Sequence, residues 1–378
     1  MEECMKRFAP IVAVCLGLAA CLVTASTRTS LAADDKKHKV LVGIGFDGNT
    51  WQSSSANLVV AMAHTKEYKD RISDITVQSA RGDPQTQIQQ INAAVQSGVD
   101  IIILWPFSET ATNRAIANAC KRGVIVITYD SEVSEPCVTT HVGIDQTWAG
   151  AGPAEGLVKL LNGKGNIIFM GGIPGNTVDK QRNDGAKAVF AKHPDIHIVA
   201  EAPSMWNPAT ARQKLTEIIA AQGWDKIDGL WTQTGCFVFS QLQVEANREK
   251  LKPCAGNGTN GFRVSMLPKG STPGALGNPG VSMGSPLWLG AYGLKLAFKV
   301  IDGGKVEKWT KAPMPLVTGE SSLLCKTADH EELVKDDFKC TAVPLSVAPD
   351  NFYIDVWNKW IPELDINSAL HGTVPNGS

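Results

Sequence analysis

The fold is decided by a stretch near the start of the chain, VLVGIGFDGNTW at residues 40–51. Its apolar first half is typical of a buried strand, and its polar second half leads into a helical pattern near residues 53–69. A second stretch, IHIVAEAPSMWNP at residues 196–208, repeats the order of strand, loop and helix. Each stretch places a tryptophan, Trp51 or Trp206, in the loop after the strand. Either these are partly buried loop residues, or they are two flat rings that face one ligand across a cleft.

Strand-like and helical patterns alternate in two series. The first has strands at 39–46, 74–80, 100–105 and 124–129, with helices near 53–69, 85–97 and 110–122. The second has strands at 165–171, 196–202, 227–233 and 251–255, with helices near 147–162, 178–192, 208–221 and 237–249. Runs such as IIIL at 101–104 are apolar on both faces, as a buried parallel strand requires. The pattern predicts an α/β fold with two similar, doubly wound parallel-sheet lobes, in which ligands bind beyond the carboxyl ends of the strands.

Composition and charge limit the classes of function. The 378 residues are 43% apolar and 19% charged, with a formal net charge of −1. The length favours two domains, and the near-zero charge gives no indication of a nucleic-acid partner. Beyond the N-terminus, no apolar stretch is long enough to span a bilayer.

Residues 1–33 have the features of an export signal. Lys6 and Arg7 precede an apolar run at 10–20, and small residues follow. Cleavage is expected after the small residues SLAA at 30–33. The alternative is a lipoprotein leader that ends before Cys21, in LAAC at 18–21, so that Cys21 carries a lipid.

Six cysteines lie beyond this leader. An even number in an exported chain predicts disulfides. We prefer disulfides between cysteines that are consecutive in the sequence, because each bond then closes one short loop of the chain. The expected pairs are Cys120–Cys137, Cys236–Cys254 and Cys325–Cys340. No metal site is expected, because no C-x-x-C motif or flanking histidine accompanies them.

The segment GNGTNG at 256–261 matches a dinucleotide-binding motif. The acidic residue expected about 20 positions later is missing, since no Asp or Glu occurs between Glu249 and Asp302. We therefore predict a flexible loop at the end of a strand and no cofactor. The motifs of common hydrolases, metalloproteases and nucleotide-binding loops are also missing, so no enzymatic activity is expected.

The end of the chain departs from the alternating pattern. A segment rich in Gly, Pro and Ser at 271–286 leads into a helix that runs to about residue 301. Residues 321–378 are expected to form an extension that packs on the outside of the lobes. Its tryptophans, Trp357 and Trp360, are expected to be core residues.

Polar residues collect at predicted strand ends and in the loops that follow. The candidate binding residues besides the tryptophans are Asp47, Asn49, Asp130, Arg182, Thr234 and Asn257. A carboxylate accepts hydrogen bonds from adjacent hydroxyls and a guanidinium donates to two, a combination suited to a sugar. The alternatives are a cap or turn residue for Asp130 and a solvated helix face for Arg182.

Four motifs together resemble the periplasmic substrate-binding proteins of the ribose-binding type, which serve ATP-driven sugar importers. They are FDGNTW at 46–51, VIVITYD at 124–130, GIPG at 172–175 with QRNDG at 181–185, and LWTQ at 230–233. The resemblance covers residues 39 to about 320. It implies one lobe formed by 34–144 and 286–320, a second formed by 145–285, and a hinge with the ligand cleft between them.

The resemblance also implies roles for individual residues. The sugar would be held by Trp51, Asp130 and Arg182, with Trp206 as the aromatic residue of the second lobe. The chain has Thr234 where the ribose pattern has Asn, and Asn257 where it has Asp. Both differences weaken the predicted hydrogen bonding to sugar hydroxyls, so ribose itself is disfavoured as the ligand.

We therefore expect a non-enzymatic, monomeric periplasmic protein that binds a monosaccharide or polyol and delivers it to a membrane permease. The alternatives are a sensor that presents its ligand to a chemoreceptor or kinase, and an exported enzyme acting on carbohydrates. A repressor of the same fold is excluded, because a leader stands where its DNA-binding helices would be.

Overall fold

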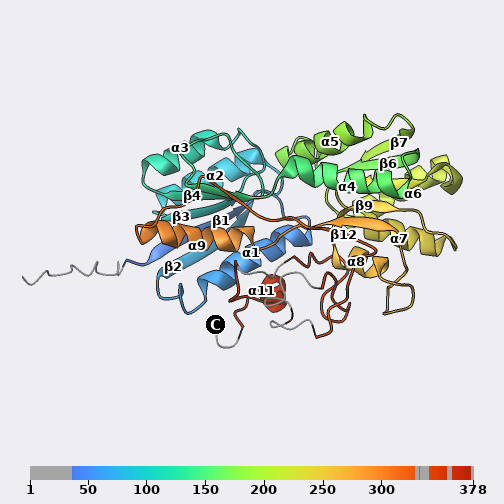
Figure 1. The fold of residues 1–378 in the computed structure, drawn as a ribbon. Coiled ribbons are helices and arrows are strands. Elements are labelled where there is room, and N and C mark those ends of the chain that lie inside the picture. Colours follow the sequence, from blue (N-terminus) through green and yellow to red (C-terminus); the bar gives the residue numbers. More distant parts are fainter. Residues whose placement is uncertain (1–35, 328–331, 333–339, 356–359, 376–378) are drawn as a thin grey trace, which may run out of the picture. The chain divides into compact units, whose positions relative to one another are not determined.

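Two six-stranded sheets organise this computed structural model, which describes residues 36–327, 332, 340–355 and 360–375 (Figure 1). The sheets lie in one unit, Lys37–Ser378. The predicted leader with Cys21 lies outside the described residues, and so does Trp357. Of the helices in the described ranges, none combines the length and the apolar character needed to cross a membrane.

The first lobe is built on a fully parallel sheet with the strand order β11-β5-β4-β3-β1-β2. Its strands are β1 His38–Ile44, β2 Ile72–Ser79, β3 Ile101–Trp105, β4 Ile125–Tyr129, β5 Thr140–Gly143 and β11 Trp309–Lys311. Its helices are α1 Thr50–Ala63, α2 Pro84–Gln96, α3 Asn113–Lys121 and α9 Leu289–Ile301.

The second lobe repeats this plan with the strand order β12-β10-β9-β8-β6-β7, in which β12 alone is antiparallel. Its strands are β6 Gly165–Gly171, β7 Ile196–Pro203, β8 Gly229–Thr232, β9 Cys254–Asn257, β10 Gly280–Met283 and β12 Leu316–Thr318. Its helices are α4 Gln146–Leu160, α5 Thr177–Phe190, α6 Pro208–Gln222, the 3-10 turn η1 Trp224–Lys226, α7 Cys236–Glu245 and α8 Asn260–Met266.

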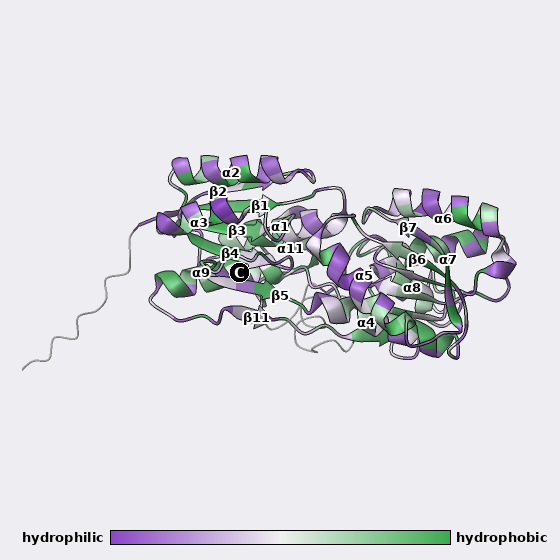
Figure 2. Cartoon of the chain, turned by 90° about the horizontal axis from the view of Figure 1, so that it is seen from above, coloured by the Kyte–Doolittle hydropathy of each residue, from purple (hydrophilic) through white to green (hydrophobic). Residues whose placement is uncertain are grey.

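Both faces of each sheet are buried. On β3, Ile101 and Ile103 pack into a core with α1 and α9, whereas Ile102 and Leu104 pack into a second core with α2 and α3. Figure 2 shows the result, with hydrophobic strands inside and hydrophilic positions on the outer helices. This arrangement confirms the predicted fold of two doubly wound α/β lobes.

The structure differs from the predicted boundaries where glycine and proline conceal regular elements. The expected flexible loop at 256–261 is instead the end of β9, a tight turn and the start of α8, and it is mostly buried. Strand β10 lies inside the Gly-, Pro- and Ser-rich segment. Strand β12 joins the second sheet, although the first lobe was expected to continue to residue 320.

The C-terminal extension contacts both lobes. Arg263 on α8 forms a buried ion pair with Asp355 (Nη1 to Oδ1, 2.9 Å), and Asp355 also accepts a hydrogen bond from the backbone of Ser285. At the other end, α11 (Ile366–His371) packs against α1, where Asn57 donates to the backbone of Ala369 at 3.0 Å.

Trp360 belongs to a cluster of aromatic side chains. Its ring stacks on that of Trp288, with ring centroids 5.5 Å apart, and meets Tyr292 edge-on. Trp360 is partly buried, so it packs against the hydrophobic core as predicted but lies at its edge.

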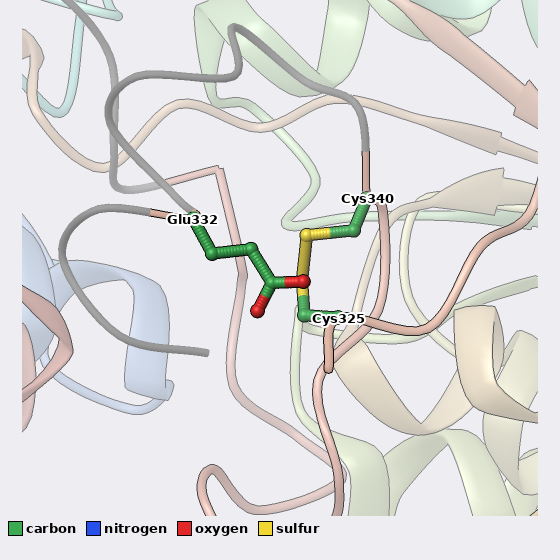
Figure 3. A group of neighbouring side chains, drawn as sticks. All are labelled: Cys325, Glu332 and Cys340. Carbon is green, nitrogen blue, oxygen red and sulfur yellow. A yellow bond between two sulfur atoms is a disulfide. The ribbon is translucent and has the colours of Figure 1, made fainter. Parts of the chain in front are cut away.

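Three disulfides join the expected partners: Cys120–Cys137, Cys236–Cys254 and Cys325–Cys340. Glu332 lies beside the third disulfide (Figure 3). Its carboxylate accepts hydrogen bonds from the backbone nitrogens of Lys326 and Thr327. Because the two sulfurs are bonded to each other, they are not the thiolates that metal ions bind, and this cluster closes a loop.

Replacing both Cys120 and Cys137 by serine should destabilise the protein by about 2–4 kcal/mol. The bond spans 17 residues, and its loss frees that loop in the unfolded chain. Urea unfolding of the variant and of the parent protein with its disulfides intact checks this value. Equal midpoints would show that the bond contributes nothing to stability.

Candidate functional site

Loops at the ends of the strands of both lobes surround two adjoining cavities. The inner chamber has a volume of about 30 Å³. The residues lining it include Trp51, Trp105, Asp130, Arg182, Trp206 and Tyr353. The outer cavity has a volume of about 630 Å³. The residues lining it include Asp47, Thr234, Phe237, Gln241, Asp350 and Asn351.

All eight predicted binding residues lie around these two cavities. Trp51, Asp130 and Arg182 line the inner chamber, and Asp47 and Thr234 line the outer cavity. The remaining three line both; they are Asn49, Trp206 and Asn257.

Two of these residues also have local roles. Asn49 caps helix α1, because its side chain accepts a hydrogen bond from the backbone nitrogen of Gln52 at 3.0 Å. Asp47 is exposed, and its carboxylate lies 3.9 Å from the guanidinium of Arg81.

The two tryptophan rings are fixed by hydrogen bonds. Trp51 lies in the first turn of α1, and its Nε1 donates to the backbone oxygen of Ser285 at 3.2 Å. Nε1 of Trp206 donates to Oε1 of Gln233 at 2.9 Å. A β-carbon on Gly172 would lie 2.1 Å from this Nε1, so the Trp206 ring needs glycine at that position.

Asp130 and Arg182 are linked through one glutamine. Nε2 of Gln146 donates to Oδ1 of Asp130 at 2.8 Å, and Oε1 of Gln146 accepts from Nε of Arg182, also at 2.8 Å. Asp130 lies at the end of β4 in the first lobe, whereas Arg182 lies on α5 in the second. The link therefore joins the two lobes across the cleft.

Asp130 adopts a backbone conformation that is uncommon for a residue other than glycine, with φ at 58°. Its Oδ2 accepts a hydrogen bond from Nε1 of Trp105 at 3.0 Å. Trp206 has a similar φ of 47°. Such conformations are costly, and they cluster at ligand-binding sites where the surroundings hold them in place.

Burial controls the charges in the inner chamber. It lowers the pKa of the Arg182 guanidinium, against the opposing effect of the Asp130 carboxylate. Burial also raises the pKa of Tyr353, whose hydroxyl forms hydrogen bonds with Thr234 and Asn257. The chamber thus combines one cation, one carboxylate and a neutral phenol.

Two residues that line the inner chamber each have a buried side-chain atom without a hydrogen-bond partner among the described residues. The atoms are Oε1 of Gln52 and Oγ of Ser285. A buried polar group without a partner costs about 1–3 kcal/mol of stability. One acceptor and one hydroxyl are thus left for a polar ligand.

Sequence reasoning did not identify several residues of the site. Trp105 ends a strand just as predicted site residues do, so the same rule could have found it. Gln146 and Ser285 lie where the chain passes between the lobes. Tyr353 lies far along the chain, in the extension, and no local pattern marks it.

Comparison with known proteins gives one family match, two similar relatives and one similar solved structure. The model of the periplasmic binding protein domain matches residues 40–305. The chain is 30% identical over 172 residues to the xylitol-binding protein of Mycolicibacterium smegmatis, covering 45% of this chain and 49% of that protein. It is 26% identical over 216 residues to the D-xylose-binding periplasmic protein of Escherichia coli K12, covering 55% and 62%. The match thus spans about half the length of the first relative and less than two thirds of the second.

A solved structure shares the fold. It is a periplasmic solute-binding protein of an ABC transporter from Actinobacillus succinogenes 130z, with bound D-allose. The TM-score is 0.60 at 22% identity, and the match covers 75% of this chain and 99% of that one.

Replacing Gln146 by leucine should favour separation of the lobes. The change leaves Asp130 and Arg182 buried without their shared partner, and a hydrogen bond to a charged group contributes about 1.5–3 kcal/mol. Small-angle X-ray scattering of ligand-free protein should give a larger radius of gyration for this variant. Gln213→Leu on the exposed face of α6 is the matched control and should match the parent. Indistinguishable curves for all three proteins would contradict the expected role of Gln146.

Proposed function

This chain belongs to the periplasmic binding protein domain family, and we propose that it binds a monosaccharide or polyol in the inner chamber. The resemblance to the ribose-binding type, predicted from the sequence, is confirmed by the family match and by relatives named for ribose and xylose. The choice of ligand class is our proposal. It is supported by relatives named for xylitol and D-xylose and by the chemistry of the chamber.

The observation that carries the proposal is the linked set of Asp130, Gln146 and Arg182. A sugar hydroxyl both donates and accepts, so adjacent hydroxyls can satisfy the carboxylate and the guanidinium together. Gln52 and Ser285 offer further polar atoms that have no hydrogen-bond partner within the part of the chain that the structure describes. The indole rings of Trp51 and Trp206 provide flat apolar surfaces for the C–H face of the ligand.

Binding requires the lobes to move. A chamber of about 30 Å³ has room for one or two water molecules and not for a sugar. We propose that the lobes separate about the segments after β5, β10 and β11, admit the ligand, and close on it around a chamber wider than the one in this structure. The ligand favours closure because it contacts Asp130 and Arg182 at the same time, which an open cleft does not allow.

We further propose the setting in which this binding acts. The chain is exported to the periplasm, and its closed, loaded form docks as a monomer on the membrane permease of an ATP-driven importer. No catalytic step is proposed. The predicted leader and the family support export, and the resemblance to importer components supports the permease.

A thermal-shift screen of pentoses, hexoses and polyols tests the proposal. A ligand that binds only the folded protein raises its melting temperature, by an increment that corresponds to about 2.7 kcal/mol at a concentration one hundred times Kd. At least one neutral sugar or polyol should give a clear increase. Asp130→Asn should then lower the affinity about tenfold or more, because one acceptor oxygen becomes a donor. If no member of the panel raises the melting temperature, the proposed ligand class is wrong.

Trp51→Ala and Trp206→Ala should each weaken binding of the ligand found in the screen by about 1–3 kcal/mol, the scale of one buried aromatic contact. Isothermal titration calorimetry measures the loss. Trp309→Ala is the control, because Trp309 is exposed and lies outside both cavities. Unchanged affinity in both site variants would remove the tryptophans from the binding site.

A further inference from the structure

The outer cavity has walls from three separate parts of the chain. The first lobe contributes Asp47 and Ser53, and the second contributes the starts of α6 and α7. The extension contributes Asp350, Asn351 and Tyr353, which lie beyond the family match at 40–305. The wall formed by the extension is therefore an addition to the part of the chain that the family model describes.

This wall is held firmly by backbone hydrogen bonds. The backbone oxygen of Asn351 accepts from the Thr50 hydroxyl at 2.6 Å, and that of Asp350 accepts from the Gly261 nitrogen at 2.8 Å. The buried ion pair of Arg263 and Asp355 lies a few residues further along the chain. The extension therefore forms a fixed surface of the cavity.

The outer cavity adjoins the inner chamber. Four residues line both; they are Asn49, Trp206, Asn257 and Tyr353. When the lobes separate, a ring bound in the inner chamber can carry a substituent that extends past these shared residues into the outer cavity. The outer cavity's volume of about 630 Å³ lies within the range of roughly 300–1,000 Å³ that is typical of ligand pockets.

The lining of the outer cavity suits an uncharged ligand. Phe237 and Pro208 provide apolar surface, and Gln241 and Asn351 provide amides. Arg212, the one arginine among the described residues that line the cavity, is paired with Glu245 at 2.8 Å.

Two carboxylates, Asp47 and Asp350, also border the cavity. A phosphate or carboxylate group on the ligand would meet these negative charges, and the described lining residues include no cation without a partner to balance it. The charges therefore favour a neutral substituent.

We propose that the outer cavity is a second subsite, which takes a second sugar ring or a neutral aglycone attached to the sugar in the inner chamber. The proposal rests on the proposed function, because it needs a sugar in the inner chamber. It extends the ligand class from free monosaccharides to neutral glycosides. Specificity for the substituent then lies largely with the extension and the starts of α6 and α7.

The test compares free sugars with their glycosides. D-xylose, D-ribose and D-allose are titrated by calorimetry as the free sugar and as methyl and phenyl glycosides of both anomers. For a sugar that binds, one phenyl glycoside should bind about tenfold more tightly than the free sugar, because its ring buries apolar surface in the outer cavity.

Ala209→Trp fills the outer cavity, which Ala209 lines with an exposed side chain. With this variant, the phenyl glycoside should no longer bind more tightly than the free sugar. The affinity for the free sugar itself should change by no more than about twofold. Ala220→Trp, at an exposed position further along α6 and outside the cavity, is the matched control and should preserve the gain.

The outcomes separate the two proposals. If a free sugar binds but no glycoside binds more tightly, the second subsite is wrong and the proposed function stands. The same holds if Ala209→Trp leaves the gain from the phenyl group intact. If no sugar or polyol of the thermal-shift panel binds and no glycoside binds, both proposals are wrong.

Discussion

One side-chain amide connects two buried charges across the cleft between the lobes. The amide nitrogen of Gln146 donates to the Asp130 carboxylate, and its amide oxygen accepts from the Arg182 guanidinium. Both charges are buried, and a buried charge is tolerated only when it is paired and hydrogen-bonded. The closed arrangement leaves these two charges satisfied because this amide offers a donor to one and an acceptor to the other.

Much of this site could be predicted, because in parallel sheets the carboxyl ends of neighbouring strands meet at one edge. The rule needs only the local sequence. It predicted that Asp130 and Trp206 lie near each other, and both line the inner chamber. It does not apply to Tyr353, which reaches the cleft through contacts of the extension with α8 and with Thr50. Strand β10 was also missed, because glycines and prolines flank a strand only four residues long. The pairing that makes it regular comes from β9 and β12, which a local pattern does not contain.

The extension is attached by an interaction that is costly to break. Arg263 and Asp355 are both almost fully buried, and Asp355 also accepts a hydrogen bond from the backbone of Ser285, near the point where the chain returns to the first lobe. Removing one partner of such a pair leaves an uncompensated charge, which typically costs about 3–5 kcal/mol. The extension is thus fixed to the second lobe at a point next to the hinge, while α11 packs on the first lobe. Motion of one lobe against the other has to be accommodated by this segment as well as by the segments after β5, β10 and β11.

The three disulfides have a consequence for how the chain matures. Each joins cysteines 15 to 18 residues apart, and each lies within one part of the protein: the first lobe, the second lobe or the extension. None of the three bonds links the lobes, so oxidation stiffens each part without restricting the hinge. In a chain that enters an oxidising compartment with its N-terminus first, every one of these cysteines meets its correct partner before the next pair emerges. Sequential emergence alone therefore selects the native pairing, and this order of oxidation would limit the need for reshuffling by a disulfide isomerase.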